Sequence, residues 1–274
     1  MGSSRVPRMP DGDGVAGRTG ASYLRFVPSE RSDDPSPVPD MRDSVRHFLS
    51  EFIGTFALTF AGSAAIMQAT MSEGNVVAIA LAPGLILAVF VSAFMHVGAH
   101  FNPAVTIGML VVRRIEPVMA GLYVVAQVAG ATAAALVLKY AFPAALFAAT
   151  RGGGQSVSLD VTSGQAFLLE MTGTMFLMWA VFGTAVDHRA PRIGGIGIGL
   201  TMTANILAFG SLTGASVNPA RSFGPAFASG IYEAQGIYWL APITGAVIAA
   251  LVYQKLLLTD EPEPADHGAI GSQP

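Results

Sequence analysis

The sequence predicts an all-α membrane protein with six transmembrane helices and two shorter helices that enter the membrane without crossing it. Three observations lead to this prediction. Hydrophobic residues make up 52% of the 274-residue chain and charged residues only 12%, whereas soluble domains carry about 25% charged residues. The apolar residues form six blocks, each long enough or nearly long enough to cross a bilayer core. The tripeptide Asn-Pro-Ala occurs twice, at 102–104 and 218–220, each time beside such blocks.

The two ends of the chain differ in composition from the rest. Residues 1–44 are rich in Gly, Pro, Ser and charge and hold no apolar segment of the kind found in signal peptides, and residues 259–274 are similar. We expect two disordered tails around one membrane domain at 45–258. The net charge of −3 and the lack of a basic patch with interleaved aromatic residues argue against nucleic-acid binding. The chain has no cysteine, which excludes disulfides and thiolate metal sites.

The six apolar blocks set the expected spans. They are 45–70, 75–97, 117–141, 165–186, 193–212 and 236–258. Most cations flank one side of these spans, at Arg42, Arg46, Arg113, Arg114, Arg189, Arg192 and Lys255. The opposite connections carry only Arg151 and Arg221 as cations. Cytoplasmic loops carry an excess of Lys and Arg, so we expect both termini on the cytoplasmic side.

Two apolar stretches, 102–112 and 218–229, are too short to be spans. Each has about a dozen residues, or about 16–18 Å of helix, which is roughly half of a ~30 Å bilayer core. Each starts with Asn-Pro, where Asn can cap a helix and Pro suits its first position. We expect both helices to begin near the bilayer midplane. Non-helical backbone at that depth is tolerated only when it is buried in protein or lines a water-filled cavity, which predicts a hydrated pathway.

An internal repeat relates the two halves of the chain. The segment 51–56 resembles 170–175, both beginning with Glu, and 123–130 resembles 238–245, both beginning with Tyr. The repeats are expected at about 45–141 and 165–258. Each repeat holds three spans, an odd number, so the two must insert in opposite orientations. Their half-length helices then enter from opposite faces and meet at the midplane, a known plan of membrane transport proteins.

With these features the sequence closely resembles the major intrinsic protein family, the aquaporins and aquaglyceroporins. The resemblance rests on the two Asn-Pro-Ala motifs, on Arg221 directly after the second, on Glu51 and Glu170 opening the two halves, and on the glycine-rich approach to each motif. It covers residues 45–258. It implies a right-handed bundle of six transmembrane helices with two re-entrant half-helices, assembled as a homotetramer with one pore per subunit.

The resemblance also implies a function. It assigns the pore motifs to Asn102, Pro103, Ala104, Asn218, Pro219 and Ala220, and the two asparagine carboxamides would donate hydrogen bonds to one passing water or hydroxyl group. Helix N-termini carry partial positive charge, so two facing N-termini and an arginine repel cations and protons. We expect a passive channel in the membrane lipid for water and small uncharged solutes. We expect neither enzymatic activity nor a cofactor, since no nucleophile–base pair is found in the sequence.

The resemblance places a selectivity filter around Arg221. Counting back from this arginine with the family's spacing puts two further wall positions at Ala215 and Ile206. The fourth position lies on the second span, where this chain is one residue shorter than the family's usual His-x-Ser-Gly approach. A gapped count gives Pro83 and an ungapped count gives Ala82, both of them non-aromatic.

The composition of this filter sets the expected solute. Water-selective members carry an aromatic residue at the fourth position and a histidine at the position of Ile206. Glycerol-selective members carry two aromatic residues and an aspartate directly after the arginine, where this chain has Ser222. The set found here resembles the plant branch that carries boric acid and related uncharged metalloid acids. We therefore expect a wide, mostly apolar mouth that passes water, glycerol and boric acid.

The sequence leaves open two other roles for its buried polar residues. Carboxylates within apolar spans often serve function, so Glu51 and Glu170 could carry the proton of a coupled secondary transporter of a small neutral solute. A structural or adhesive membrane protein of the same fold is a third hypothesis. The resemblance favours loop support, with both glutamates accepting hydrogen bonds from re-entrant backbone and His100 supporting the loop before Asn102. No metal site is expected, because the histidines lack partners at ligand spacing. A bacterial inner membrane is the expected location.

Overall fold

Within the computed structural model, which describes residues 41–258 except 73, 190 and 192, all regular structure is helical. Six of the described helices are long and apolar enough to cross a membrane, as the apolar blocks predict. These helices are α1 Met41–Met71, α2 Val76–Phe94, α4 Pro117–Ala141, α6 Ser163–Val181, α7 Ile196–Thr213 and α9 Gln235–Val252. Both α6 and α9 continue into one wider helical turn, η2 Phe182–Val186 and η3 Tyr253–Leu257.

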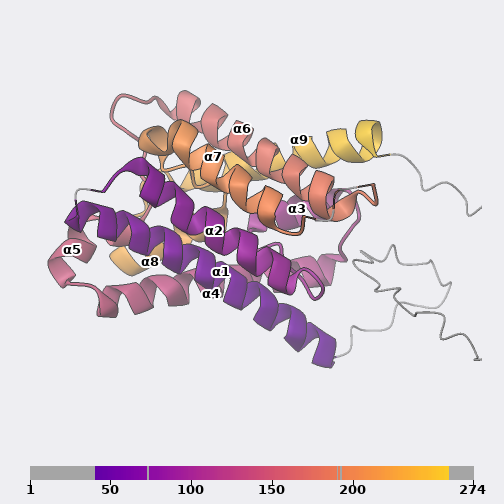
Figure 1. The fold of residues 1–274 in the computed structure, drawn as a ribbon, viewed down its shortest axis with the longest axis horizontal. Coiled ribbons are helices and arrows are strands. Elements are labelled where there is room, and N and C mark those ends of the chain that lie inside the picture. The colour runs from indigo at the N-terminus through magenta and orange to yellow at the C-terminus, as the bar shows by residue number, and fades with distance from the viewer. Residues whose placement is uncertain (1–40, 73, 190, 192, 259–274) are drawn as a thin grey trace, which may run out of the picture.

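Two further helices, α3 Pro103–Val111 and α8 Pro219–Ser229, begin at the Asn-Pro-Ala motifs. Both are too short to span a bilayer, as expected from the sequence. They lie toward opposite ends of the bundle (Figure 1), α3 toward the end where the described chain starts and stops, and α8 toward the end that holds α5 Ala144–Ala149. The half-length helices therefore enter from opposite sides.

Helix packing follows the inverted repeat. In each half the first and last spans pack together, α1 against α4 and α6 against α9, while α2 packs against α7 across the halves. Each half-length helix packs against the last span of the other half, α3 on α9 and α8 on α4.

Equivalent glycines bring the paired spans of each half together. A Cβ placed on Gly130 of α4 would lie 2.4 Å from the Phe52 carbonyl oxygen, and one on Gly245 of α9 would lie 2.1 Å from that of Met171. Small residues let membrane helices approach this closely. The glycine and its contact thus recur at the same place in both halves, which links the repeat in the sequence to a repeat in the packing.

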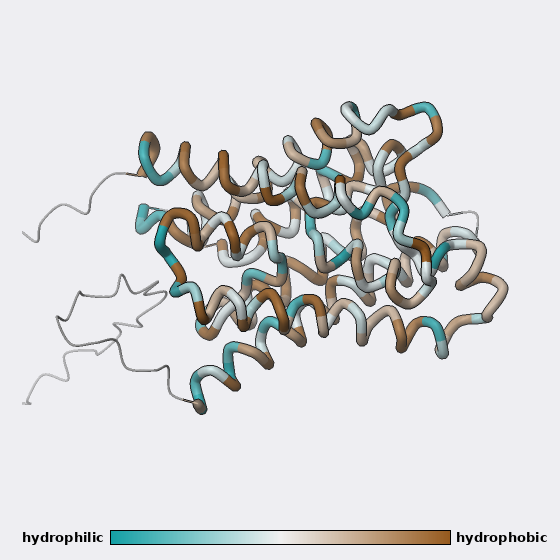
Figure 2. The backbone as a smooth tube through the Cα atoms, turned by 180° about the vertical axis from the view of Figure 1, so that it is seen from behind, coloured by the Kyte–Doolittle hydropathy of each residue, from teal (hydrophilic) through white to brown (hydrophobic). Residues whose placement is uncertain are grey.

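The outer surface of the bundle is apolar. Figure 2 shows hydrophobic residues along the lengths of the helices and hydrophilic residues gathered mostly at the two ends. Large side chains that face outward include Leu85, Val89, Val125, Leu200 and Leu240. A soluble monomer rarely exposes so large an apolar surface, and this one suits contact with lipid tails.

The structure corrects some boundaries. Helix α1 begins at Met41, inside the tail expected at 1–44, because Asp43 lies favourably in its first turn and pairs with Arg46 at 3.1 Å. Helix α7 begins at Ile196, later than expected, after a turn that contains Gly194 with φ 59°. The connection after α4 holds two short helices that the sequence did not predict, α5 and η1 Arg151–Gly153. Tail residues 1–40 and 259–274 lie outside the described part of the chain.

Candidate pore

Glu51 holds the loop that leads into α3. Its carboxylate is fully buried in α1 and accepts hydrogen bonds from the backbone N–H groups of His100 at 2.8 Å and Phe101 at 2.7 Å. Gln127 of α4 donates a third bond from Nε2 at 2.8 Å. A buried carboxylate that accepts several N–H bonds is well satisfied, and here it fixes the backbone directly before Asn102.

Glu170 does the same for the loop that leads into α8. Its carboxylate, fully buried in α6, accepts from the backbone N–H groups of Ser216 at 2.9 Å and Val217 at 2.7 Å, and from the Thr213 hydroxyl at 2.7 Å. Both loops carry strained backbone, with φ 49° at Phe101 and φ 46° at Val217. Non-glycine residues keep such conformations only where the surroundings impose them, and the two carboxylates do so here.

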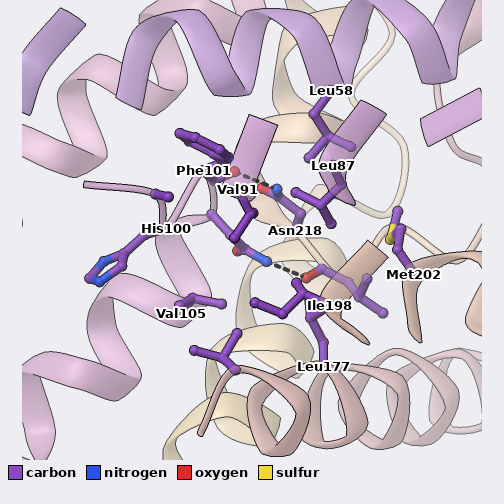
Figure 3. Close-up of a pocket in the computed structure, with 14 residues that line it drawn as sticks. Leu58, Leu87, Val91, His100, Phe101, Val105, Leu177, Ile198, Met202 and Asn218 are labelled. Atoms are coloured by element: carbon purple, nitrogen blue, oxygen red, sulfur yellow. Dashed lines mark hydrogen bonds between the residues drawn. The ribbon is translucent and has the colours of Figure 1, made fainter. Parts of the chain in front are cut away.

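The two motif asparagines lock the half-length helices together. Asn102 caps α3 through its Oδ1, which accepts from the Ala104 N–H at 2.9 Å, and its Nδ2 donates to the Val217 carbonyl at 2.8 Å. Asn218 caps α8 in the same way at Ala220, and its Nδ2 donates to the Phe101 carbonyl at 2.8 Å. Figure 3 shows the two reciprocal bonds side by side. The positive N-terminal ends of α3 and α8 therefore face each other at the centre of the molecule.

A cavity of about 20 Å³, room for about one water molecule, is lined by both asparagines. Its side walls come from both halves of the chain and are aliphatic or thioether side chains: Leu58, Leu87, Val91, Leu177, Val181, Ile198 and Met202. An asparagine NH₂ group has two hydrogens, and the reciprocal bond uses one from each residue. The second hydrogen leaves each carboxamide able to bind a molecule in a cavity whose walls are mostly apolar.

Arg221 lies one turn into α8 and is 1% exposed. Its Nη1 donates to the carbonyl oxygens of Ala215 at 2.9 Å and Ser216 at 3.4 Å. Its Nε is buried and has no hydrogen-bond partner among the described residues. A buried donor without a partner is costly, so an oxygen atom that reached this N–H would bind there favourably.

The other expected filter residues lie as follows. Ala215 and Ile206 are buried, and the Ala215 carbonyl holds Arg221 directly. Pro83 is buried within α2, whereas Ala82 is partly exposed. A Cβ placed on Gly62 of α1 would lie 3.4 Å from both the Pro83 Cβ and the Arg221 Nε, so Pro83 and Arg221 both border the space beside Gly62.

Two residues that the sequence did not single out, Gln127 and Thr106, also support the first loop. Gln127 Nε2 donates a further bond to the Thr106 hydroxyl at 3.0 Å, and that hydroxyl donates to the Asn102 carbonyl at 3.1 Å. His100 contacts Thr106 through Nδ1 at 3.1 Å and lies edge-on to the Tyr123 ring, consistent with support of the loop. The role of Gln127 could have been suspected from the sequence, because a glutamine is unusual inside an apolar span. The internal repeat did not help, because the second half has Pro242 at the equivalent position.

A family model described as "Major intrinsic protein" matches residues 40–253. The chain belongs to the major intrinsic protein family. A probable aquaporin TIP-type alpha from Phaseolus vulgaris is 38% identical, over 89% of this chain and 96% of that protein. Nodulin-26 from Glycine max is 40% identical, over 85% of this chain and 84% of that protein.

A solved structure of similar fold is that of the aquaglyceroporin from Plasmodium falciparum. It has a TM-score of 0.70 and 25% identity and covers 78% of this chain and 96% of that one. The expected fold, a right-handed bundle of six spans and two half-length helices in an inverted repeat, is confirmed. The family member described here is thus an integral membrane channel and not an enzyme. Because these curated relatives are plant proteins, the expected bacterial inner membrane finds no support.

Proposed function

We propose that this channel passively carries water and small uncharged solutes, among them glycerol and boric acid, and excludes ions and protons. The observation that carries the proposal is a pair of reciprocal hydrogen bonds, in which Asn102 donates to the Val217 carbonyl and Asn218 donates to the Phe101 carbonyl. These bonds hold two helix N-termini face to face beside a cavity that residues of both halves line. This arrangement offers hydrogen-bond donors to a neutral molecule. It also places partial positive charge where a cation would have to pass.

Ion exclusion rests on two positive features in series. The facing ends of α3 and α8 repel cations at the centre, and the Arg221 guanidinium adds a full charge further along α8. Half-helix ends combined with an arginine form such an electrostatic barrier in selective pores. A water whose oxygen accepts hydrogen bonds from both asparagines cannot also accept one from a neighbouring water. The hydrogen-bonded chain of waters along which a proton could move is therefore interrupted.

Passage of solutes larger than water rests on the remaining filter walls. Pro83, Ala215 and Ile206 are aliphatic and carry neither an aromatic ring nor an imidazole to narrow the opening. The Nε–H of Arg221, which has no partner in the described part of the chain, offers a bond to a hydroxyl oxygen, while the apolar walls accept the rest of the solute. This combination suits a small polyol or an uncharged hydroxy acid.

The two buried glutamates support a passive channel more than a coupled transporter. Each carboxylate accepts two backbone N–H bonds and a side-chain bond, so each has a structural task already. We also infer that both termini face the cytoplasm, from the distribution of Lys and Arg, and that the protein forms a homotetramer with a pore in each subunit. Crosslinking in membranes tests the tetramer, and protease access to sealed vesicles tests the orientation.

Stopped-flow light scattering of proteoliposomes that contain the full chain tests the proposal. We expect water, glycerol and boric acid to equilibrate faster than in empty liposomes, while a pH dye inside the vesicles reports no added proton leak. Water permeation with every solute excluded would contradict the solute assignment. A proton leak that scales with protein content would contradict the exclusion of protons.

A further inference from the structure

We propose that Gly62 of α1 is a fifth wall of the constriction at Arg221, and that its missing side chain sets how large a neutral solute can pass. The inference rests on the proposed channel function and deepens it. It adds α1 to the helices that form the proposed filter. The residue it names is a glycine, which has no side chain and so leaves the constriction wider.

The first support is direct proximity. A Cβ on Gly62 would lie 3.4 Å from the Arg221 Nε, 3.6 Å from its Nη2 and 3.4 Å from the Pro83 Cβ. The bare backbone of Gly62 therefore faces the gap between these two filter residues. The same Nε is the buried donor that has no partner among the described residues. A side chain at position 62 would fill the space next to the N–H that a solute hydroxyl would use.

The second support is helix periodicity. The cavity at the asparagines is lined by Leu58 of α1, Leu87 of α2 and Met202 of α7. Residues four apart lie on the same face of a helix, one turn along. On these three helices, that turn leads to Gly62, Pro83 and Ile206, respectively. Gly62 thus occupies on α1 the place that proposed filter residues occupy on α2 and α7.

The third support is the internal repeat. Gly62 follows Glu51 at the same interval as Val181 follows Glu170, so the two are equivalent residues of the two halves. Val181 lines the cavity on its side of the asparagines. Its equivalent in the inverted half should face the passage on the opposite side, beside Arg221. The passage therefore has a branched side chain at this position in one half and none in the other.

The backbone around Gly62 is held in place. A Cβ on Gly153 would lie 2.3 Å from the Ser63 carbonyl oxygen, so the loop at η1 is packed directly on α1 next to Gly62. This contact resists an outward shift of α1. A side chain added at position 62 would consequently extend into the passage.

Substitution of Gly62 tests the proposal, with Gly121 of α4 as the matched control. A Cβ on Gly121 meets no atom within 4 Å, and both glycines lie inside long helices. Gly62→Ala places a methyl group at ordinary contact distance, so the variant should fold. We expect it to lower the permeability to glycerol and boric acid about tenfold, the usual effect of one carbon in a tight pocket, with a smaller loss for water. Gly62→Val should stop solute passage, whereas Gly121→Ala and Gly121→Val should behave as wild type.

Two results would overturn the inference, and both can be told apart from failure of the proposed function. If wild type passes glycerol and Gly62→Ala and Gly62→Val keep its solute-to-water permeability ratio, Gly62 is not a wall of the filter. If wild type passes water alone, the solute assignment fails. Gly62 is then tested by water: an equal water permeability of Gly62→Val and Gly121→Val would show that Gly62 is not a wall of the filter. Size-exclusion profiles of all four variants show whether any loss of flux follows from misfolding. If Gly62→Val misfolds, the permeabilities of Gly62→Ala test the inference.

Discussion

At the scale of single residues, the molecule depends on a few buried polar groups within apolar surroundings. The two asparagines were predictable from the sequence, because a pair of Asn-Pro-Ala motifs in half-length apolar stretches, in register with a repeat, is highly specific. The choice between Pro83 and Ala82 was not, since a one-residue gap in the following loop shifts the count. In the structure Pro83 is buried and, like Arg221, borders the space beside Gly62, which favours Pro83 for the proposed filter.

The double variant Pro83→Phe with Ile206→His tests the proposed filter. Two larger rings beside Arg221 should narrow the opening, so that glycerol and boric acid are excluded while water still passes. Stopped-flow measurements on the double variant and on wild type give the two permeabilities. The partly exposed neighbour provides the control, because Ala82→Phe should leave solute flux nearly unchanged. Undiminished boric acid flux in the double variant would place the filter elsewhere.

At the scale of elements, the structure depends on how its helices are held at their ends. The spans were predictable to within a few residues because apolar blocks mark them, and both half-length helices begin where Asn-Pro predicts. Helix α5, the wide turns η2 and η3 and the irregular backbone at Phe209 of α7 were not predictable. These features depend on contacts from distant parts of the chain, which no local pattern records.

Removing a loop anchor should destabilise the half-length helix that follows it. Glu51→Gln keeps the shape of the side chain but removes its charge and replaces one acceptor oxygen by an NH₂ group that faces backbone donors. We expect a loss of about 2 kcal/mol in the free energy of unfolding, seen as a lower Tm in detergent. Glu116→Gln, at an exposed position without a side-chain cap bond, should leave the Tm unchanged. A Tm equal to wild type in Glu51→Gln would mean that the carboxylate is not the anchor.

A clamp formed by Asp187 and Arg189 joins the ends of α6 and α9, and its carboxylate predicts a pH dependence of stability. The guanidinium of Arg189 donates to both oxygens of Asp187, at 2.6 Å and 2.9 Å, and also to the Leu257 carbonyl at 2.9 Å. These bonds hold the pKa of Asp187 well below its usual range. A carboxylate whose folded pKa is lowered contributes stability above its unfolded pKa of about 4 and loses it as the pH falls below that value.

Asp187→Asn should therefore lower the Tm at pH 7 and have progressively less effect below pH of about 4. Thermal unfolding of both proteins across this pH range gives the comparison. The exposed residue Asp160 supplies a control, since Asp160→Asn should shift the Tm little at any pH. A Tm difference between Asp187→Asn and wild type that is the same at pH 3 and pH 7 would contradict the clamp.

At the scale of the whole molecule, the two halves of the chain have the same arrangement of helices and pack together in opposite orientations. The sequence predicted this arrangement because each repeat holds an odd number of spans. The packing of α3 on α9 and of α8 on α4 confirms it. The reciprocal bonds from Asn102 to the Val217 carbonyl and from Asn218 to the Phe101 carbonyl could not be predicted, because each depends on a backbone group of the other half. They convert two helix caps into one site at the centre of the bundle.

The central claim is that this site belongs to a passive pore for neutral solutes. The most direct test is the rate of glycerol uptake into proteoliposomes as a function of glycerol concentration, with and without an uncoupler. We expect a rate that rises in proportion to concentration and is the same under both conditions. Uptake that saturates and collapses when the uncoupler is added would contradict a passive pore.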